Sequence, residues 1–516
     1  MVSLDQGTDG TTAGSSAATR WPLLAALALV ATLGTVNSLR NSLWFDEACT
    51  LFTTAAGPAD AVRRAVRFEQ QPPLYFLLAW SWRALHPAIE FLRLFSLLVS
   101  LGTVALLGWV SSRLRVGDRG WNLALLGALT PQLLWAASEA RVYALAILAA
   151  TASTALFLRL IDPERAPRRG DVAAYVLTAW LGLATFYYTG FVLLGHGVAG
   201  LTSPRRRTVI GALAVVGLLL LPWLPVVQAQ FAARQSYLPD LPWTRQAFGA
   251  SWLLDAANWT VGSLIEAVFR AAPYMLTWPG RLVILGSLLL AVGARLLPAA
   301  RPVSGTEWRL LLAATVPLAV LVLLRVSNLS LVEERHWVIA LPGLLLLPGL
   351  LLREAAPGWP RRVATAAVLA TFALGTVSFA RNYRGQADWK AVGRFLNAKV
   401  RAGDPVVLYA TDGALPLEYY FPRSNPVFQL PEPDKRRPHT EIVMTAADGV
   451  RAREALAAAR DAGRLWLLEK NGLPADSALV MLRRYDDDSL AVGEALRFGR
   501  TRVRAVLVTR RDQASR

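Results

Sequence analysis

The chain has 516 residues, of which 54% are hydrophobic and only 17% are charged, and its mean hydropathy is +0.37. Soluble domains carry about a quarter charged residues, so this composition excludes an ordinary soluble protein. The formal net charge is +18. Most of the excess is arginine at the ends of apolar segments, which indicates orientation in a membrane rather than binding of nucleic acid.

Apolar blocks of roughly 17 to 22 residues follow one another along the chain, and that length matches a helix that crosses about 30 Å of hydrocarbon. Segment 1–20 is rich in Gly, Ser and Thr and is expected to be a disordered tail. After it we predict about eleven transmembrane helices. They lie at 21–39, 91–111, 120–138, 141–160, 172–187, 189–202, 208–227, 281–298, 308–325, 337–353 and 362–380.

Arginines gather in alternate loops, at 113–119, 159–169, 205–207, 295–301 and 353–362. The positive-inside rule places these loops, and the N-terminus, in the cytoplasm. The remaining connections are then expected outside the cytoplasm. They are loop 40–89, the turns at 138–141 and 186–189, loop 228–280, loop 326–336 and everything after about residue 381.

Three short segments outside the main blocks have patterns of their own. Segment 59–67 reads as an amphipathic surface helix, while 72–85 and 259–274 are apolar or aromatic but too short to span, which is typical of interfacial elements. After residue 381, helical segments 387–400 and 451–462 alternate with strand-like segments at 405–410, 464–469 and 503–509. This alternation predicts a transmembrane domain over 21–380 and a small extracytoplasmic α/β domain over 381–516.

The first candidate for chemistry is the pair Asp46 and Glu47, which directly follows the first helix. A carboxylate at the outer membrane surface can accept a proton from a hydroxyl nucleophile, as a general base does. Alternatively, Asp46 caps the short helix that follows it. The spacing supports both interpretations equally.

Further candidates occupy three other outward positions. Glu139, Arg141 and Tyr143 belong to the run 137–143 at the outward turn between two helices. Arg335 follows the acidic pair Glu333–Glu334, and Arg93 lies at the outer end of the second helix. A single arginine at a membrane boundary often only extends its head group to water. Several arginines with carboxylates on one face, however, suit a phosphorylated lipid, because the guanidinium fork binds phosphate in a bidentate manner.

The sequence offers little for a metal or nucleotide. Cys49 is the single cysteine, the four histidines have no close metal-ligand spacing, and no nucleotide-binding glycine motif is present. We therefore expect no cofactor. A divalent metal could still be held by the oxygens of Asp46, Glu47 and Glu69. For the acidic run Asp486–Asp488, calcium binding is the alternative and a surface turn is the favoured interpretation.

Taken in order, the motifs resemble those of the GT-C fold glycosyltransferases that use lipid-linked sugars. The similarity is to bacterial relatives of protein O-mannosyltransferases and to lipid A aminoarabinose transferases. The segments that carry it are Leu43–Ala48, Gln71–Leu78, Leu92–Ser96, Ser138–Leu145, Glu334–Pro342 and Asp388–Val407. The chain departs from the family at Gln71, where many relatives have histidine, and at His336, where tyrosine is common and where we favour a packing role.

The resemblance implies a specific activity. Such enzymes move a sugar, a hexose or a pentose, from a polyprenyl-phosphate carrier to a hydroxyl acceptor outside the cytoplasm, usually with inversion. It implies that Asp46 is the base and Glu47 its neighbour, that Arg141 and Arg335 lie near the donor phosphate, and that Arg93 assists. The expected location is the bacterial cytoplasmic (inner) membrane, where the acceptor is an envelope glycan, a glycolipid or a protein.

Two other classes remain open. A transporter or flippase of a lipid-linked sugar should place ionisable residues in the middle of its helices, whereas most charges here lie at helix ends. A non-catalytic assembly protein with an outer binding domain would leave Asp46 replaceable. The enzyme is the favoured interpretation.

Overall fold

The computed structural model describes residues 12–113, 123–235, 262, 264–265, 267–269, 271–326, 334–383, 388–409, 413–422, 424–431, 446–470, 477–485, 490–498 and 501–508. The chain divides into two compact units. The helical unit comprises 1–39, 56–228 and 240–383, and the α/β unit comprises 40–55, 229–239 and 384–516. Each unit is described in turn.

Eight described segments of the chain are helical, long enough and apolar enough to cross a membrane. They coincide with predicted blocks, and the first helix begins earlier than expected, at Thr12, inside segment 1–20. The helices of these segments are α1 (Thr12–Arg40), α5 (Ile89–Arg113), α8 (Tyr143–Ile161), α11 (Arg206–Leu220) with α12 (Leu224–Gln235), α15 (Trp278–Leu296), α16 (Gly305–Val326), α17 (Leu341–Glu354) and α18 (Trp359–Asn382).

The other three predicted blocks are helical but shorter. Blocks 172–187 and 189–202 correspond to α9 (Arg169–Thr185) and α10 (Thr189–Leu201), while 120–138 is divided between α6 (Leu123–Ala128) and α7 (Pro131–Ala137). The break has a local cause. Thr130 has the extended backbone (φ −86°, ψ 115°) that a following proline favours, because the Pro131 ring clashes with a helical predecessor.

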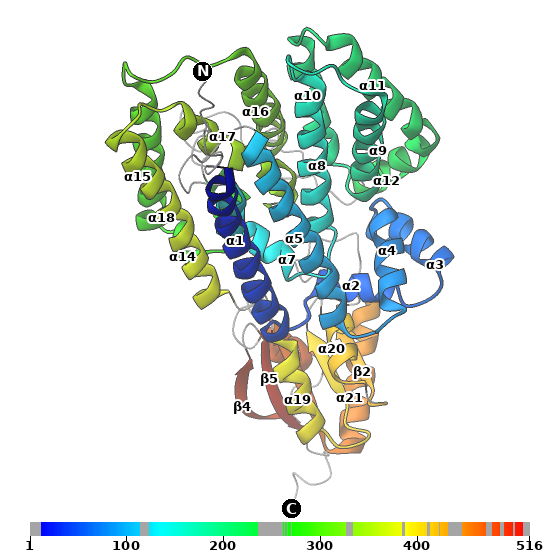
Figure 1. Ribbon diagram of the computed structural model, residues 1–516. Helices are drawn as coiled ribbons and strands as arrows, with labels where there is room; N and C mark the ends of the chain where they lie inside the picture. Colours follow the sequence, from blue (N-terminus) through cyan, green and yellow to red (C-terminus); the bar gives the residue numbers. More distant parts are fainter. Residues whose placement is uncertain are drawn as a thin grey trace, which may run out of the picture. The chain divides into compact units, whose positions relative to one another are not determined.

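The helices of the helical unit pack in neighbouring pairs, such as α5 with α8, α10 with α16 and α15 with α18 (Figure 1). Close approach requires small residues at the contact. A methyl group added at Gly195 of α10 would lie 2.6 Å from the carbonyl oxygen of Ala313 in α16, and one at Gly343 would lie 3.0 Å from the Cα of Ala314. Small residues at such contacts are the usual means of packing helices in a membrane.

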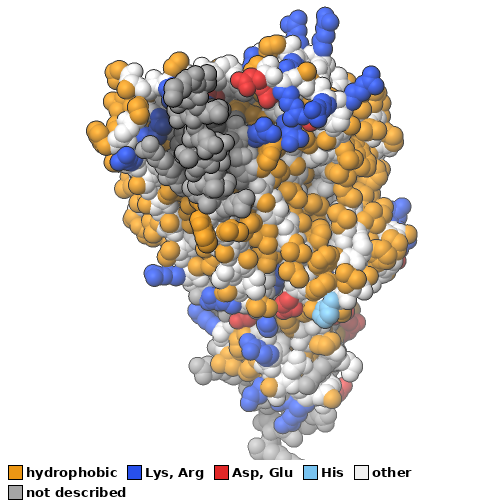
Figure 2. Space-filling model, viewed as in Figure 1, with side chains coloured by type: hydrophobic (Ala, Val, Ile, Leu, Met, Phe, Trp, Pro, Cys, Tyr) orange, Lys and Arg blue, Asp and Glu red, His pale blue; other side chains and the backbone are white. Residues whose placement is uncertain are grey.

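One end of the helical unit gathers arginines, and we call it the arginine-rich end. Here the ends of α5 and α8 meet the start of α9. The guanidinium of Arg159, in α8, lies 4.7 Å from the ring centroid of Trp109 in α5 and 3.5 Å from the carboxylate of Asp171 in α9. Figure 2 shows Lys and Arg side chains at the top right, above a broad band of hydrophobic side chains. This segregation is expected of a membrane protein.

The segment between α1 and α5 forms short helices, as expected for surface and interfacial elements. They are α3 (Pro58–Arg64), the π-helix Ala65–Glu69 and α4 (Leu74–Arg83). The C-cap of the π-helix is Gln70, whose left-handed backbone (φ 54°, ψ 41°) is unusual for a residue other than glycine. In the predicted interfacial segment 259–274, the described residues 262, 264–265 and 267–269 are helical, and α14 (Pro273–Leu276) follows. The residues 259–261, 263, 266 and 270 lie outside the described residues, as do Glu333 and Asp486–Asp488.

The α/β unit contains a five-stranded sheet of order β2-β1-β3-β5-β4. The β1 strand is parallel to β2 and β3, while β5 is antiparallel to β3 and β4. The strands are β1 (Val406–Tyr409), β2 (Val427–Leu430), β3 (Arg464–Lys470), β4 (Leu490–Phe498) and β5 (Thr501–Val508). The predicted α/β fold is therefore confirmed, and sequence reasoning missed β2 and β4.

Helices bury both faces of this sheet. Alternate residues of a strand point to opposite sides, so each strand contributes to both layers. Leu465 and Leu467 of β3 pack in one cluster with α21 (Ala446–Ala462) and α22 (Ser477–Arg483). Trp466 and Leu468 pack in a second cluster with α19 (Trp389–Lys399) and α20 (Ala414–Tyr420).

A buried carboxylate ties the start of β1 to β3. Asp404 accepts hydrogen bonds from the Arg464 guanidinium, from the Arg401 backbone N–H at 2.8 Å and from the Trp466 indole at 3.2 Å. Burial by itself would raise the pKa of Asp404, but the hydrogen bonds from Arg464, Arg401 and Trp466 outweigh it and hold that pKa below its ordinary value. The ionised carboxylate therefore stabilises the folded unit.

Candidate functional site

Arg93 lies in the first turns of α5 and is only 1% exposed. Its Nη1 donates a 2.7 Å hydrogen bond to the carbonyl oxygen of Ser38, near the end of α1. A buried guanidinium is costly unless it is paired and hydrogen-bonded, and this hydrogen bond offsets part of that cost. The interpretation that Arg93 merely extends to water is wrong.

Glu139 and Arg141 lie in the tight turn that joins α7 to α8. The Arg141 N–H donates to the Glu139 carbonyl at 2.8 Å, and both residues are buried. The hydroxyl of Tyr383, directly after α18, donates to the Glu139 carboxylate at 2.9 Å. The turn is thus attached to a residue that is distant in the sequence, and this buries the two charges that the sequence analysis selected.

Arg141 forms an ion pair with Glu69, at the end of the π-helix. Their side chains are 4% and 6% exposed, and Nη1 lies 3.2 Å from one carboxylate oxygen and 3.3 Å from the other. A π-helical turn is uncommon and is frequent at functional sites. These contacts, with those of Arg93 and Glu139, gather at one end of the helical unit, and we call it the carboxylate end.

Tyr143 and His336 belong to a cluster of aromatic rings. The Tyr143 ring, 1% exposed, lies 4.9 Å from Trp135 and 6.3 Å from Phe186, and His336 stacks on Tyr188 at 4.3 Å. These contacts support the packing role expected for His336. Its neighbour Arg335 is half-buried at the start of the 3₁₀ helix Glu334–Ala340.

In the α/β unit, Asp46 and Glu47 lie in the first turn of α2 (Phe45–Thr53). Glu47 is fully buried, whereas Asp46 is half-buried and remains partly exposed. The N-cap of α2 is Trp44, so the alternative that Asp46 caps this helix is wrong. The N-terminal turn of a helix nevertheless favours a negative charge, because the unsatisfied N–H groups carry partial positive charge.

The residues just before α2 are held by the α/β unit itself. The Leu43 N–H donates to the Tyr420 hydroxyl of α20 at 2.9 Å, and the Ser42 hydroxyl accepts from the Lys390 N–H of α19 at 2.9 Å. The segment that carries Asp46 is therefore positioned by helices from the C-terminal part of the chain.

The described residues offer a poor match to a metal site. Among them, no group of three or more His, Cys, Asp or Glu side chains is arranged to hold a metal ion. The carboxylate of Glu69, one of the three oxygen ligands considered, accepts hydrogen bonds from Arg141 instead.

Sequence reasoning missed three polar partners of the candidate residues. They are the Ser38 carbonyl, the Tyr383 hydroxyl and Glu69 in its role as the partner of Arg141. Glu69 is marked by the π-helical segment and by the left-handed Gln70 that follows it, and neither is visible in the sequence pattern.

No protein-family model matches this sequence, and no curated protein is detectably similar to it. The structure, however, matches that of ArnT from Cupriavidus metallidurans in the apo state, with a TM-score of 0.57 and 13% identity. It also matches the same protein bound to undecaprenyl phosphate, with a TM-score of 0.56 and 14% identity. Each match covers 95% of this chain and 98% of the ArnT chain.

The chain has the GT-C fold. This confirms the predicted architecture, a polytopic helical membrane protein with a C-terminal α/β region. Because the match extends over nearly the whole of both chains, it includes the helical unit and the α/β unit together.

Proposed function

We propose that this protein is an integral-membrane glycosyltransferase. It moves a sugar from a polyprenyl-phosphate carrier to a hydroxyl acceptor at the outer face of the bacterial cytoplasmic membrane. The observation that carries the proposal is the fold shared with ArnT, which has been crystallised with undecaprenyl phosphate. The buried arginines Arg93 and Arg141 support it, because they supply the cationic groups that a phosphate requires.

The proposed reaction is a single displacement with inversion. Asp46 accepts the proton of the acceptor hydroxyl, and that oxygen attacks the anomeric carbon of the sugar. The bond from the anomeric carbon to the phosphate oxygen breaks, and polyprenyl phosphate leaves with the electron pair. Arg141, Arg335 and Arg93 stabilise the negative charge that develops on the phosphate, so no nucleotide is needed.

The two carboxylates of α2 have different roles in this proposal. Asp46 keeps access to its surroundings and is therefore the base, whereas Glu47 is fully buried and supports the first turn of the helix. The reaction requires no cofactor. Transfer is accordingly expected to persist in EDTA, and its loss there, with recovery on addition of Mg²⁺ or Mn²⁺, would contradict this part of the proposal.

The test compares the wild-type protein with Asp46→Asn. Both are purified in detergent and supplied with radiolabelled polyprenyl-phosphate sugars, a hexose and a pentose among them, and with envelope fractions as acceptors. Loss of a general base lowers rates about 100-fold to 10,000-fold, so transfer should fall by at least about 100-fold while donor binding is retained. The labelled product identifies the sugar and the class of acceptor.

Asp60→Asn is the matched control. Asp60 is also in the predicted outer loop, but its partner is Arg63 in an exposed i,i+3 pair at the surface, and the substitution should leave transfer unchanged. If the wild type binds the donor without transferring sugar, and neither substitution changes this, the enzyme proposal is wrong. Movement of intact labelled donor from one leaflet of a proteoliposome membrane to the other would then identify a flippase.

A further inference from the structure

A second cationic feature lies at the arginine-rich end of the helical unit. A cavity of about 730 Å³ is lined by Leu201, Thr202, Ser203, Pro204, Arg205, Arg206, Arg207, Thr208 and Arg309. We call it the arginine cavity. Four of the nine lining residues are arginines and none is acidic. Its size is within the range of small-molecule sites, about 300–1,000 Å³.

The arginines of this cavity come from two distant parts of the chain. Arg205 is the N-cap of α11 and Arg206 and Arg207 begin that helix, whereas Arg309 belongs to the first turns of α16. Arg309 is anchored there, because its Nε and Nη2 donate to the Thr202 carbonyl at 3.2 and 3.0 Å. Orientation in a membrane requires only that arginines occur in a loop. It does not require arginines from separate loops to share one cavity.

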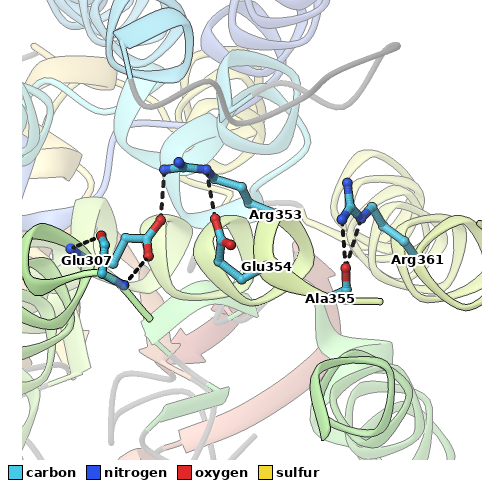
Figure 3. A network of polar contacts seen from close by, with 6 residues as sticks. Glu307, Arg353, Glu354, Ala355 and Arg361 are labelled. Atoms are coloured by element: carbon cyan, nitrogen blue, oxygen red, sulfur yellow. Dashed lines mark hydrogen bonds and ion pairs between the residues drawn. The ribbon is translucent and has the colours of Figure 1, made fainter. Parts of the chain in front are cut away.

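The charges of the arginine cavity are not balanced as they are elsewhere at this end. Asp171, in the first turn of α9, pairs with Arg159 and Arg165. Glu307, in the first turn of α16, pairs with Arg353, which also bonds Glu354 (Figure 3).

By contrast, the first turn of α11 has no acidic residue. Arg205, the N-cap of α11, donates a hydrogen bond from Nη2 to the Pro163 carbonyl at 3.4 Å. Positive side chains at a helix N-terminus oppose the helix dipole, so an anion in the cavity would relieve the repulsion.

We propose that the arginine cavity binds a phosphate group, and its surroundings favour the phosphodiester of an anionic phospholipid. Leu201 in the lining is 59% exposed, and Ile210 and Trp308, close in sequence to the cavity arginines, are 39% and 56% exposed. Exposed apolar side chains beside a cationic cavity at the end of membrane helices suit a headgroup above acyl chains. This site is separate from the proposed donor chemistry, which uses residues at the carboxylate end and in α2.

The test measures equilibrium binding of radiolabelled phosphatidylglycerol to the full chain in a non-ionic detergent. Unlabelled phosphatidylglycerol, phosphatidylcholine and inorganic phosphate are the competitors. We expect phosphatidylglycerol to compete best and its binding to weaken as NaCl increases. Arg206→Gln with Arg207→Gln should weaken binding about 25-fold, at about five-fold for each arginine.

Arg301→Gln with Arg362→Gln is the control, because it removes the same charge from exposed side chains at the same end that do not line the cavity. It should leave affinity within about two-fold of the wild type, since surface charges away from a site contribute little. Arg206→Lys with Arg207→Lys keeps the charge but loses the guanidinium fork, so its loss of affinity should be smaller than that of the glutamine variant. This lysine variant provides the test if the glutamine variant fails to fold.

Three results would overturn the proposal: equal losses in the two glutamine variants, equal competition by phosphatidylcholine, or unchanged affinity in both the glutamine and the lysine variants of the cavity. Inorganic phosphate that competes as well as phosphatidylglycerol would instead identify a soluble phosphate as the ligand and overturn the assignment to a lipid. Sugar transfer is not measured in this experiment, so its outcome is independent of the proposed enzyme activity.

Discussion

The buried pair of Arg141 and Glu69 allows the structural role of an arginine to be separated from its chemical role. At a distance of 3.2 Å, the Coulomb attraction is about 5 kcal/mol for an effective dielectric constant of about 20. Removal of one partner leaves the other charge buried, and such changes typically cost about 3–5 kcal/mol. Arg141→Met should therefore lower the free energy of unfolding by about that amount.

The double variant Arg141→Met with Glu69→Gln removes both charges. Replacement of a whole buried pair is often close to neutral, so most of the lost stability should return, which corresponds to a coupling of about 2–3 kcal/mol. Sugar transfer, in contrast, should remain at least about 100-fold below the wild type, because the charge at the donor phosphate is still absent.

The assay follows unfolding of the wild type, the two single variants and the double variant in mixed micelles by tryptophan fluorescence, and measures transfer with the same preparations. A double variant as unstable as Arg141→Met would refute the reasoning about the ion pair. A double variant that recovers transfer together with stability would refute the proposed role of Arg141 at the donor phosphate.

Three further predictions concern stability, each measured as the free energy of unfolding. Because Asp404 has a lowered pKa, the stability that its ionised carboxylate contributes is complete above about pH 4 and is lost as the pH falls through the folded-state pKa. Asp404→Asn should therefore lower the free energy of unfolding by about 1–3 kcal/mol at pH 7. The difference in stability between the wild type and this variant should shrink below about pH 4. Tyr383→Phe removes the donor to the Glu139 carboxylate and should cost about 1.5–3 kcal/mol, and an unchanged stability would show that this bond contributes nothing. Gly195→Ala would place a methyl group 2.6 Å from a backbone oxygen and should destabilise the protein by about 1–3 kcal/mol. Gly211→Ala, where the added methyl group meets no atom within 4 Å, should stabilise it by up to about 1 kcal/mol. Equal effects of the two substitutions would contradict the packing argument.

The membrane architecture could be predicted because it depends on local properties of the sequence. Whether a segment can cross hydrocarbon depends on its own length and hydropathy, so eight spans followed from the apolar blocks. The strands at 405–410 and 464–469 were visible for the same reason. The first is continuously apolar, the second has the apolar run Leu465–Leu468, and these runs are buried on both faces of the sheet. The β4 strand was missed because Gly493 and Glu494 interrupt its apolar pattern, at the point where its pairing with β5 shifts register.

The candidate residues were also found from local patterns, since carboxylates and arginines at helix ends stand out in an apolar sequence. Their environments were not local. Arg141 pairs with a residue 72 positions away and Glu139 with one 244 positions away, and loops of that length close only when the helices pack. The difference between a buried Glu47 and an accessible Asp46 likewise depends on how α2 packs within the α/β unit.

By itself, the sequence determined that the chain spans a membrane, where its helices lie, and that acidic and arginine side chains occur at their ends. The tertiary structure decided which of those charges meet, namely Arg141 with Glu69, and Arg309 with the arginines of α11 around one cavity. The physical reason is that hydropathy is a sum over neighbouring residues. An ion pair or a cavity, in contrast, depends on distances between helices that only the packed fold establishes.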